Sequence, residues 1–174
     1  ISFIRVYRNT PQLFILNQTI KEGILKTSIN LNFEEKGNII DDYRVEGSIK
    51  NAKINLLNQQ IVQNINLNFE INNKNYILKN SNLKFNKIKL SSKKISIHEK
   101  NKYFLIKGDF ENTNSLFSPE KLSIFFKKDF KEIDFKDLYF DSSNNFEFKI
   151  NKKFKFSDIK FQSKIDISNL IYTK

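Results

Sequence analysis

The sequence contains no cysteine, methionine or tryptophan, and its 174 residues include only four glycines, two prolines and one histidine. Without cysteine the chain forms no disulfide and no zinc site built on thiolates. No apolar run approaches the ~18 residues that a membrane-spanning helix requires, and no secretory signal opens the chain. The chain begins at Ile1 and not at Met, so we expect it to be a segment of a longer protein.

Arginine is also scarce, because only 3 of the 30 basic residues are Arg, while 19 acidic residues leave a net charge of +11. Lys, Asn, Ile, Phe and Tyr supply 100 of the 174 residues, and their codons are rich in A and T, so an AT-rich genome explains much of the lysine excess. Nucleic-acid interfaces favour Arg and gather their basic residues in one patch. Because the lysines are spread along the whole chain, we expect no nucleic-acid partner.

Most of the chain alternates between apolar and polar residues, most strictly in the runs 25–34, 65–72 and 146–151. Strict alternation indicates half-buried strands with one apolar face and one polar face. The apolar residues of these runs are the candidates for a binding surface: Leu25, Ile29, Leu31, Phe33, Ile65, Leu67, Phe69, Ile71, Phe146, Phe148 and Ile150. Shorter alternating pieces fill much of the remainder, and we expect about ten to twelve mostly antiparallel strands, because the connections are too short for parallel crossovers.

Polar clusters at 35–38, 72–75, 99–102 and 142–145 predict turns. The phase of the alternation slips near Asn51, between Phe85 and Ile88, and between Phe156 and Ile159. A β-bulge or a turn at each slip keeps the apolar side chains on one face. With so few glycines, Asn is expected to supply the positive φ angles.

Two segments, 11–22 and 119–128, have apolar residues at helical spacing. Each opens with a proline after a capping hydroxyl residue, and Gly23 follows the first. The sequence therefore predicts a mainly β fold: a large curved antiparallel sheet, either an open groove or a flattened barrel, with two short helices. We expect one β-rich unit over residues 1–174; two strand-rich units, about 1–115 and 116–174, are the alternative.

Residues suited to enzymatic chemistry are few. His98, the single histidine, follows a predicted strand at a polar turn and has no partners for a catalytic triad. The carboxylates are interleaved with lysines, which is typical of surface charge balance and not of a paired catalytic site. The sequence has neither a glycine-rich phosphate loop nor calcium-loop spacing. We expect no enzymatic activity, no catalytic residue, and no metal or other cofactor.

Two short helices are too small to cover the apolar face of so large a sheet. The face must pair with itself in a sandwich, close on itself, or remain a partly open groove. An open groove exposes far more contiguous apolar surface than a monomer normally shows. Acyl chains are its natural occupant, because each buried CH₂ contributes about 0.8 kcal/mol.

Several passages resemble the AsmA-like family of periplasmic lipid-transport proteins (the YhdP/TamB type), over about residues 10–172. They are the helix-to-strand entry at 21–25, the glycine-containing strands at 45–54 and 104–110, and the passage 65–97. The resemblance implies a long curved sheet with an apolar inner groove, in a periplasmic protein that is anchored to the inner membrane by parts outside this segment and moves phospholipid toward the outer membrane. It implies no catalytic residue.

The expected function is therefore a non-enzymatic segment that binds or conducts phospholipid acyl chains. The alternative is a structural or adhesive β-sandwich domain of a surface protein. The resemblance does not identify the lipid or the direction of transport.

Overall fold

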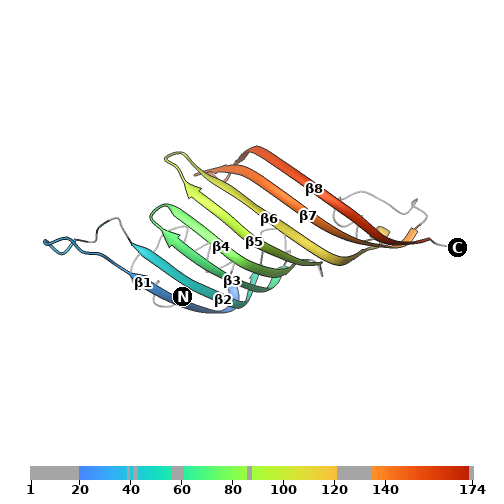
Figure 1. Cartoon of the computed structure of the whole chain (residues 1–174), viewed down its shortest axis with the longest axis horizontal. Coiled ribbons are helices and arrows are strands. Elements are labelled where there is room, and N and C mark those ends of the chain that lie inside the picture. Colours follow the sequence, from blue (N-terminus) through green and yellow to red (C-terminus); the bar gives the residue numbers. More distant parts are fainter. Residues whose placement is uncertain are drawn as a thin grey trace.

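The computed structural model describes residues 20–38, 40, 43–55, 61–85, 88–120 and 135–172. They form eight strands: β1 (Ile20–Asn30), β2 (Arg44–Asn55), β3 (Ile61–Asn72), β4 (Asn75–Phe85), β5 (Ile88–Glu99), β6 (Tyr103–Phe117), β7 (Phe135–Asn151) and β8 (Phe156–Tyr172). Consecutive strands pair antiparallel, so the order in the sheet is the order in the sequence (Figure 1). The predicted mainly antiparallel β fold is confirmed.

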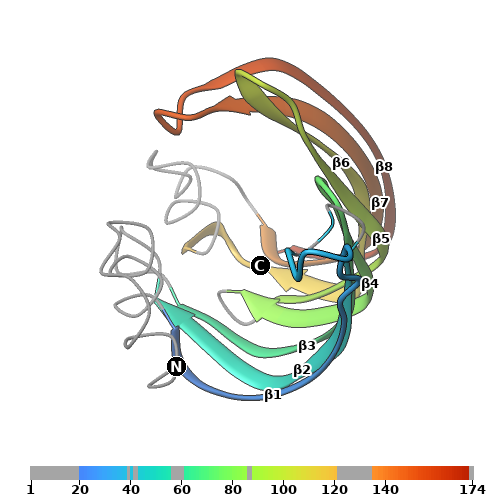
Figure 2. The ribbon, with the colours of Figure 1, turned by 90° about the vertical axis from the view of Figure 1, so that its left-hand side faces the viewer.

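The sheet is open, because β1 and β8 are its two edges and do not pair with each other. The eight described strands form this one sheet, which is neither closed on itself nor stacked in a sandwich. Figure 2 shows that the strands bend along their length, so that the ribbons follow an arc in that view. Among the described residues few hydrophobic side chains are buried, so much of the apolar surface that a globular protein buries remains uncovered.

The chain reverses direction at the polar clusters 35–38, 72–75 and 99–102, as predicted. At the second of these, Asn73 has a positive φ of 51° between β3 and β4. The turn predicted at 142–145 is wrong, because these residues lie inside β7. The Asn144 side chain there donates to the Phe110 carbonyl of β6 (3.2 Å) and to the Ser142 hydroxyl (2.8 Å), so cross-strand partners satisfy polar groups that otherwise favour a turn.

The described strands number eight, and not ten to twelve, because bulges join shorter alternating pieces into long strands. Asn51, with φ 51°, lies inside β2, where the pairing with β3 shifts between Ile49 and Ala52. Asp158, with φ 52°, lies in β8 at the phase slip between Phe156 and Ile159, where the pairing with β7 also shifts. The slip after Phe85 separates β4 from β5. The bulges predicted at the first and last of these slips are confirmed.

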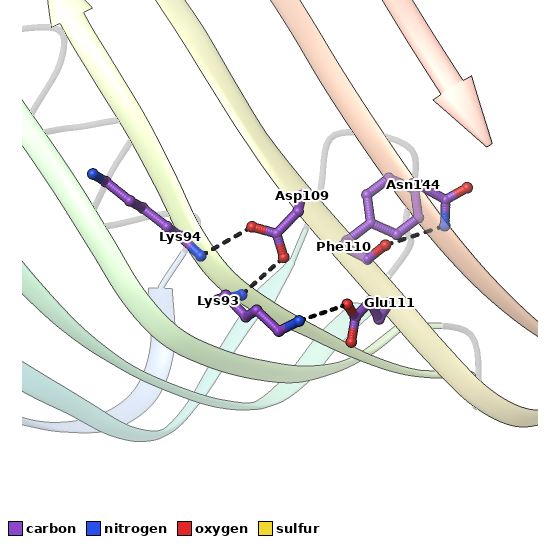
Figure 3. A network of polar contacts seen from close by, with 6 residues as sticks. All are labelled: Lys93, Lys94, Asp109, Phe110, Glu111 and Asn144. Atoms are coloured by element: carbon purple, nitrogen blue, oxygen red, sulfur yellow. Dashed lines mark hydrogen bonds and ion pairs between the residues drawn. The ribbon is translucent and has the colours of Figure 1, made fainter. Parts of the chain in front are cut away.

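Side chains of the neighbouring strand bond to the backbone at two bulges, the one at Asn51 in β2 and another between Ser91 and Ile95 in β5. The Asn51 N–H donates to Asn66 Oδ1 of β3 at 3.0 Å. In β5, the N–H groups of Lys93 and Lys94 donate to the two carboxylate oxygens of Asp109 in β6, at 2.9 and 3.1 Å (Figure 3). Bulges bend a strand and increase its twist. The polar side chains near the phase slips therefore fix the backbone at these bulges.

Asparagine supplies most of the positive φ angles, as predicted, but mainly inside strands and not at turns. The described non-glycine residues with positive φ are Asn51, Asn64, Asn73, Asn80, Asn114, Phe154 and Asp158. At Asn114, in β6, the backbone N–H donates to Asp141 Oδ1 of β7 at 2.5 Å. Asn tolerates the left-handed conformation at a small cost, which is why it replaces Gly at these positions.

Neither predicted helix is shown. Residues 20–22 of the first lie in β1, and its remainder lies outside the described residues. Gly23, expected to end that helix, is instead in β1 with φ 145°, where an added Cβ would lie 2.9 Å from the Ala52 Cβ of β2. Of the second, only Pro119 and Glu120 are described, and two residues do not make a helix. No helix in the described part of the chain has the length and apolar character needed to span a membrane.

Candidate functional site

The register of the strands places apolar side chains of all eight strands on one face. Directly opposed residues of antiparallel strands point to the same side of a sheet. One row of partners, from β1 to β7, is Ile29, Val45, Ile71, Tyr76, Ile97, Ile106 and Phe148. The next row, from β1 to β8, is Thr27, Gly47, Phe69, Leu78, Ile95, Gly108, Phe146 and Phe161. We call the side that carries these rows the apolar face.

The opposite side is polar and carries ion pairs. One of its rows, from β1 to β8, is Ser28, Glu46, Glu70, Ile77, Ser96, Lys107, Glu147 and Lys160. Glu70 pairs with Lys79 at 2.6 Å, and this hydrogen bond lowers the pKa of the Glu70 carboxyl. Glu147 contacts Lys160 at 2.9 Å and Lys107 at 3.7 Å, and its pKa is lowered in the same way, mainly by Lys160. These contacts connect neighbouring strands across the polar face.

Nine of the eleven candidate residues lie on the apolar face: Leu25 and Ile29 in β1, Ile65, Leu67, Phe69 and Ile71 in β3, and Phe146, Phe148 and Ile150 in β7. Leu31 and Phe33 do not lie in the same strand as Leu25, because β1 ends at Asn30. Their side chains are 41% and 59% exposed in the connection that turns at 35–38. The expectation that one strand runs through Phe33 is therefore wrong.

The candidate residues predicted from the sequence do not include the apolar side chains of the edge strand β8. Its apolar-face residues include Phe156, Ile159, Phe161, Ile165 and Ile167, which are all exposed. Their alternation was visible in the sequence, but the bulge at Asp158 divides it into short pieces.

The β6–β8 end of the apolar face is rich in phenylalanine. Phe110 lies 6.1 Å from both Phe146 and Phe161, and Phe148 lies 5.5 Å from Phe156, measured between ring centroids. The register joins these rings from three strands into one cluster.

Few side chains of the apolar face are buried. Among the described residues, the hydrophobic residues that are less than 9% exposed are Ala52, Ile65 and Phe140, at 6%, 6% and 8%. Towards the edges, Ile29 is 55% exposed and Phe161 is 59% exposed. A contiguous apolar surface of this kind is characteristic of a binding surface and unusual for a monomer.

The described residues bring together little that is suited to catalysis. His98 lies inside β5 and not at a turn, and its Nδ1 lies 2.6 Å from Asn75 Oδ1 of β4. In the part of the chain that the structure describes, no three His, Cys, Asp or Glu side chains gather where they could hold a metal ion.

Comparisons with protein-family models, with curated proteins and with solved structures give no match for this chain.

Proposed function

We propose that this chain is a non-enzymatic segment that binds or conducts phospholipid acyl chains along its apolar face. The observation that carries the proposal is the pair of register-aligned rows that bring apolar side chains of all eight strands to one open face. Water contact with these side chains is unfavourable, and hydrocarbon is an occupant that removes it without requiring hydrogen bonds.

The dimensions of the face suit an acyl chain. With a strand spacing of about 4.8 Å, a row that crosses eight strands spans about 34 Å. One leaflet of a bilayer contributes about 15 Å of hydrocarbon depth. A row is therefore longer than one acyl chain, so a chain can lie within it or move along it.

The proposed location of the protein, in the periplasm, rests on the family resemblance alone. We propose that the segment belongs to an AsmA-like periplasmic protein, anchored to the inner membrane by another part of that protein, that moves phospholipid toward the outer membrane. The alternative, a structural β-sandwich domain, needs a second sheet over the apolar face. Because the described strands form a single sheet, that second layer would have to come from elsewhere.

Site-specific photocrosslinking tests the proposal. A photoreactive residue at Leu67 or Ile29, on the apolar face, should capture phospholipid during expression, and mass spectrometry of the adducts identifies it. The matched controls are Asn68 and Ser28, which are adjacent in the same strands and lie on the polar face. Asn66 is a poor control, because its side chain accepts the Asn51 N–H. Equal lipid capture from both faces, or protein–protein adducts at Leu67, would contradict the proposal and favour the structural alternative.

A single charge in the row provides a second test. The Leu67 side chain is only half-buried, so the carboxylate of Leu67→Asp can remain hydrated and the domain should stay folded. The same charge interrupts the hydrocarbon path, so capture of lipid by a photoreactive residue at Ile29 should fall. A folded Leu67→Asp variant with undiminished capture would show that acyl chains do not follow this row.

A further inference from the structure

The apolar face contains a cluster of polar side chains near its middle, on β4 to β7. We call this cluster the polar island; it consists of Ser81, Ser92, Asn112, Ser142 and Asn144. Ser81 is the cross-strand partner of Ser92, and Asn112 is the partner of Ser142. Asn144 is the partner of Phe110, which belongs to the phenylalanine cluster of the apolar face.

The register fixes the side of the sheet on which the island lies. Asn82 pairs with Asn66 of β3 and with Ser91 of β5, in a row on the polar face. Their sequence neighbours Ser81 and Ser92 therefore point to the apolar face, because successive strand residues alternate.

Four of the five island residues are buried, all except Ser142, and the island is incompletely hydrogen-bonded. Ser81, Ser92 and Asn112 are 6%, 8% and 6% exposed, and the Oγ atoms of the two serines and Nδ2 of Asn112 have no hydrogen-bond partner among the described residues. The other half of the island is satisfied internally: the Ser142 hydroxyl donates to Asn112 Oδ1, and Asn144 Nδ2 donates to Ser142 Oγ at 2.8 Å.

Leaving a buried polar group unpaired costs about 1–3 kcal/mol, so three such groups on an apolar face need a partner. All three groups can donate a hydrogen bond: two hydroxyls and one amide NH₂. No charged residue belongs to the island, and an unpaired charge is far costlier to bury than a neutral dipole. The complementary group is therefore a neutral acceptor attached to hydrocarbon.

We propose that the polar island binds the ester carbonyl oxygens of a glycerolipid, whose acyl chains extend over the flanking apolar rows. This inference rests on the proposed function, and it specifies the ligand as a diester lipid held in one register. The hydroxyls of Ser81 and Ser92 and the Asn112 Nδ2 donate to the carbonyl oxygens. The apolar face then has a preferred stopping point for each lipid in place of a uniform hydrocarbon path.

The test compares two lipids that differ only in those carbonyls. Dihexanoyl phosphatidylcholine and its dihexyl ether analogue, both below their micelle-forming concentrations, are titrated into the intact chain by calorimetry. The wild type should bind the diester about tenfold more tightly than the diether, since each added hydrogen bond contributes modestly. The Ser81→Ala/Ser92→Ala variant should lose most of that preference, because only Asn112 Nδ2 remains as a donor, while its affinity for the diether stays unchanged. The matched control is Ser91→Ala/Ser143→Ala, which removes exposed hydroxyls from neighbouring residues on the polar face and should retain the preference.

Stability separates a ligand site from a structural one. Because neither serine hydroxyl has a partner, Ser81→Ala/Ser92→Ala should leave the melting temperature of the lipid-free protein unchanged or raised. A lowered melting temperature together with weaker binding of both lipids would show a structural role and overturn the inference. Equal affinity of the wild type for diester and diether would show that water alone satisfies the island, which also overturns it. Binding of neither lipid would instead contradict the proposed function.

Discussion

Strands β3 and β8 carry the same alternating pattern, but the sheet buries them very differently. Ile65 in β3 is 6% exposed, whereas Phe161 on the same face of β8 is 59% exposed, and every described residue of β8 is exposed. The difference lies in the neighbours: among the described strands, β3 is flanked on both sides, and β8 pairs only with β7. In a single open sheet, the hydrophobic pattern determines which face a side chain occupies. The position of its strand in the sheet determines how much of that side chain is covered.

The ion pairs that join the edge strand β8 to β7 are largely exposed to solvent. Lys160 of β8 pairs with Glu147 at 2.9 Å, and Asp158 of β8 pairs with Lys149 at 2.7 Å. Exposed ion pairs of this kind contribute little to stability, because water and salt screen them. The lysines and the bulge at Asp158 also make the free edge of β8 less suited to pairing with other chains. The following predictions test this contrast between middle and edge.

The largest difference is expected when the same charge is placed on the apolar face at the two positions. Ile65→Asp buries a carboxylate without a partner and should destabilise the fold by about 3 kcal/mol or more, or prevent folding. Phe161→Asp leaves its carboxylate in water and should cost about 1 kcal/mol or less. Urea denaturation followed by circular dichroism measures both values. Similar losses from the two variants would mean that the edge is as well covered as the middle.

A smaller difference is expected between Gly47 in β2 and its cross-strand partner Thr27 in the edge strand β1. A Cβ added at Gly47 would lie 2.1 Å from the Lys26 carbonyl oxygen and 2.8 Å from the Phe69 ring, so β1 and the ring must both move. Gly47→Ala should therefore cost about 1–3 kcal/mol. Thr27→Ala removes one exposed hydrogen bond, to the Glu46 carbonyl, and should cost about 0.5 kcal/mol. Thermal unfolding of both variants checks the order, and an unchanged melting temperature for Gly47→Ala would contradict the close approach.

The alternation alone was sufficient to predict the class of fold, the faces of most strands and two of the bulges. Period two is a property of the strand backbone itself, so it survives without knowledge of neighbouring strands. The register is different, because a strand whose alternation is regular matches its neighbour equally well after a shift of two residues. That is why the continuous rows across eight strands, and the part of β8 in them, became visible only in the structure.

The residues 142–145 show the limit of local composition most clearly. Two serines followed by two asparagines have the composition of a turn, and the sequence predicts a turn there. In the structure they continue β7, and Ser142 and Asn144 bond to groups of β6 that are 30 and 34 residues away in the chain. The polar island could not be predicted because it depends on these long-range partners.

A third comparison is between Asp109 of β6, which bonds to the backbone at the bulge of β5, and Asp166 in the edge strand β8. Asp109 accepts two backbone N–H groups, at 2.9 and 3.1 Å, and Asp109→Ala should cost about 1–2 kcal/mol because these groups return to water and the bulge loosens. Asp166 makes one exposed ion pair with Lys164, so Asp166→Ala should change the unfolding free energy by less than about 0.5 kcal/mol. Denaturant titration measures both, and an Asp109→Ala variant as stable as the wild type would show that the carboxylate does not support the bulge.

The smallest effect concerns pH and the attachment of β8. The hydrogen bond from Lys160 lowers the pKa of the Glu147 carboxyl below its ordinary value of 4.5, and Lys149 lowers the pKa of Asp158 in the same way. A carboxyl with a lowered pKa in the folded state stabilises that state fully above its unfolded value, and the contribution is lost as the pH falls through the folded value. Acidification below pH 4.5 at low salt should therefore weaken the contacts between β7 and β8, with a small effect because both groups are exposed.

Hydrogen exchange resolves this effect by strand. Protection factors of the β8 amides should fall between pH 6 and pH 3.5, while those of β3, whose strand has two neighbours, should change much less. Glu147→Gln should reduce the pH dependence of β8, and 0.5 M salt should do the same by screening the exposed pairs. Glu70→Gln is the matched variant in the middle of the sheet, where the pair with Lys79 joins two strands that are each held on their other side. Equal loss of protection in β3 and β8 on acidification would show that the sheet opens as one unit, and that the edge is not its weaker part.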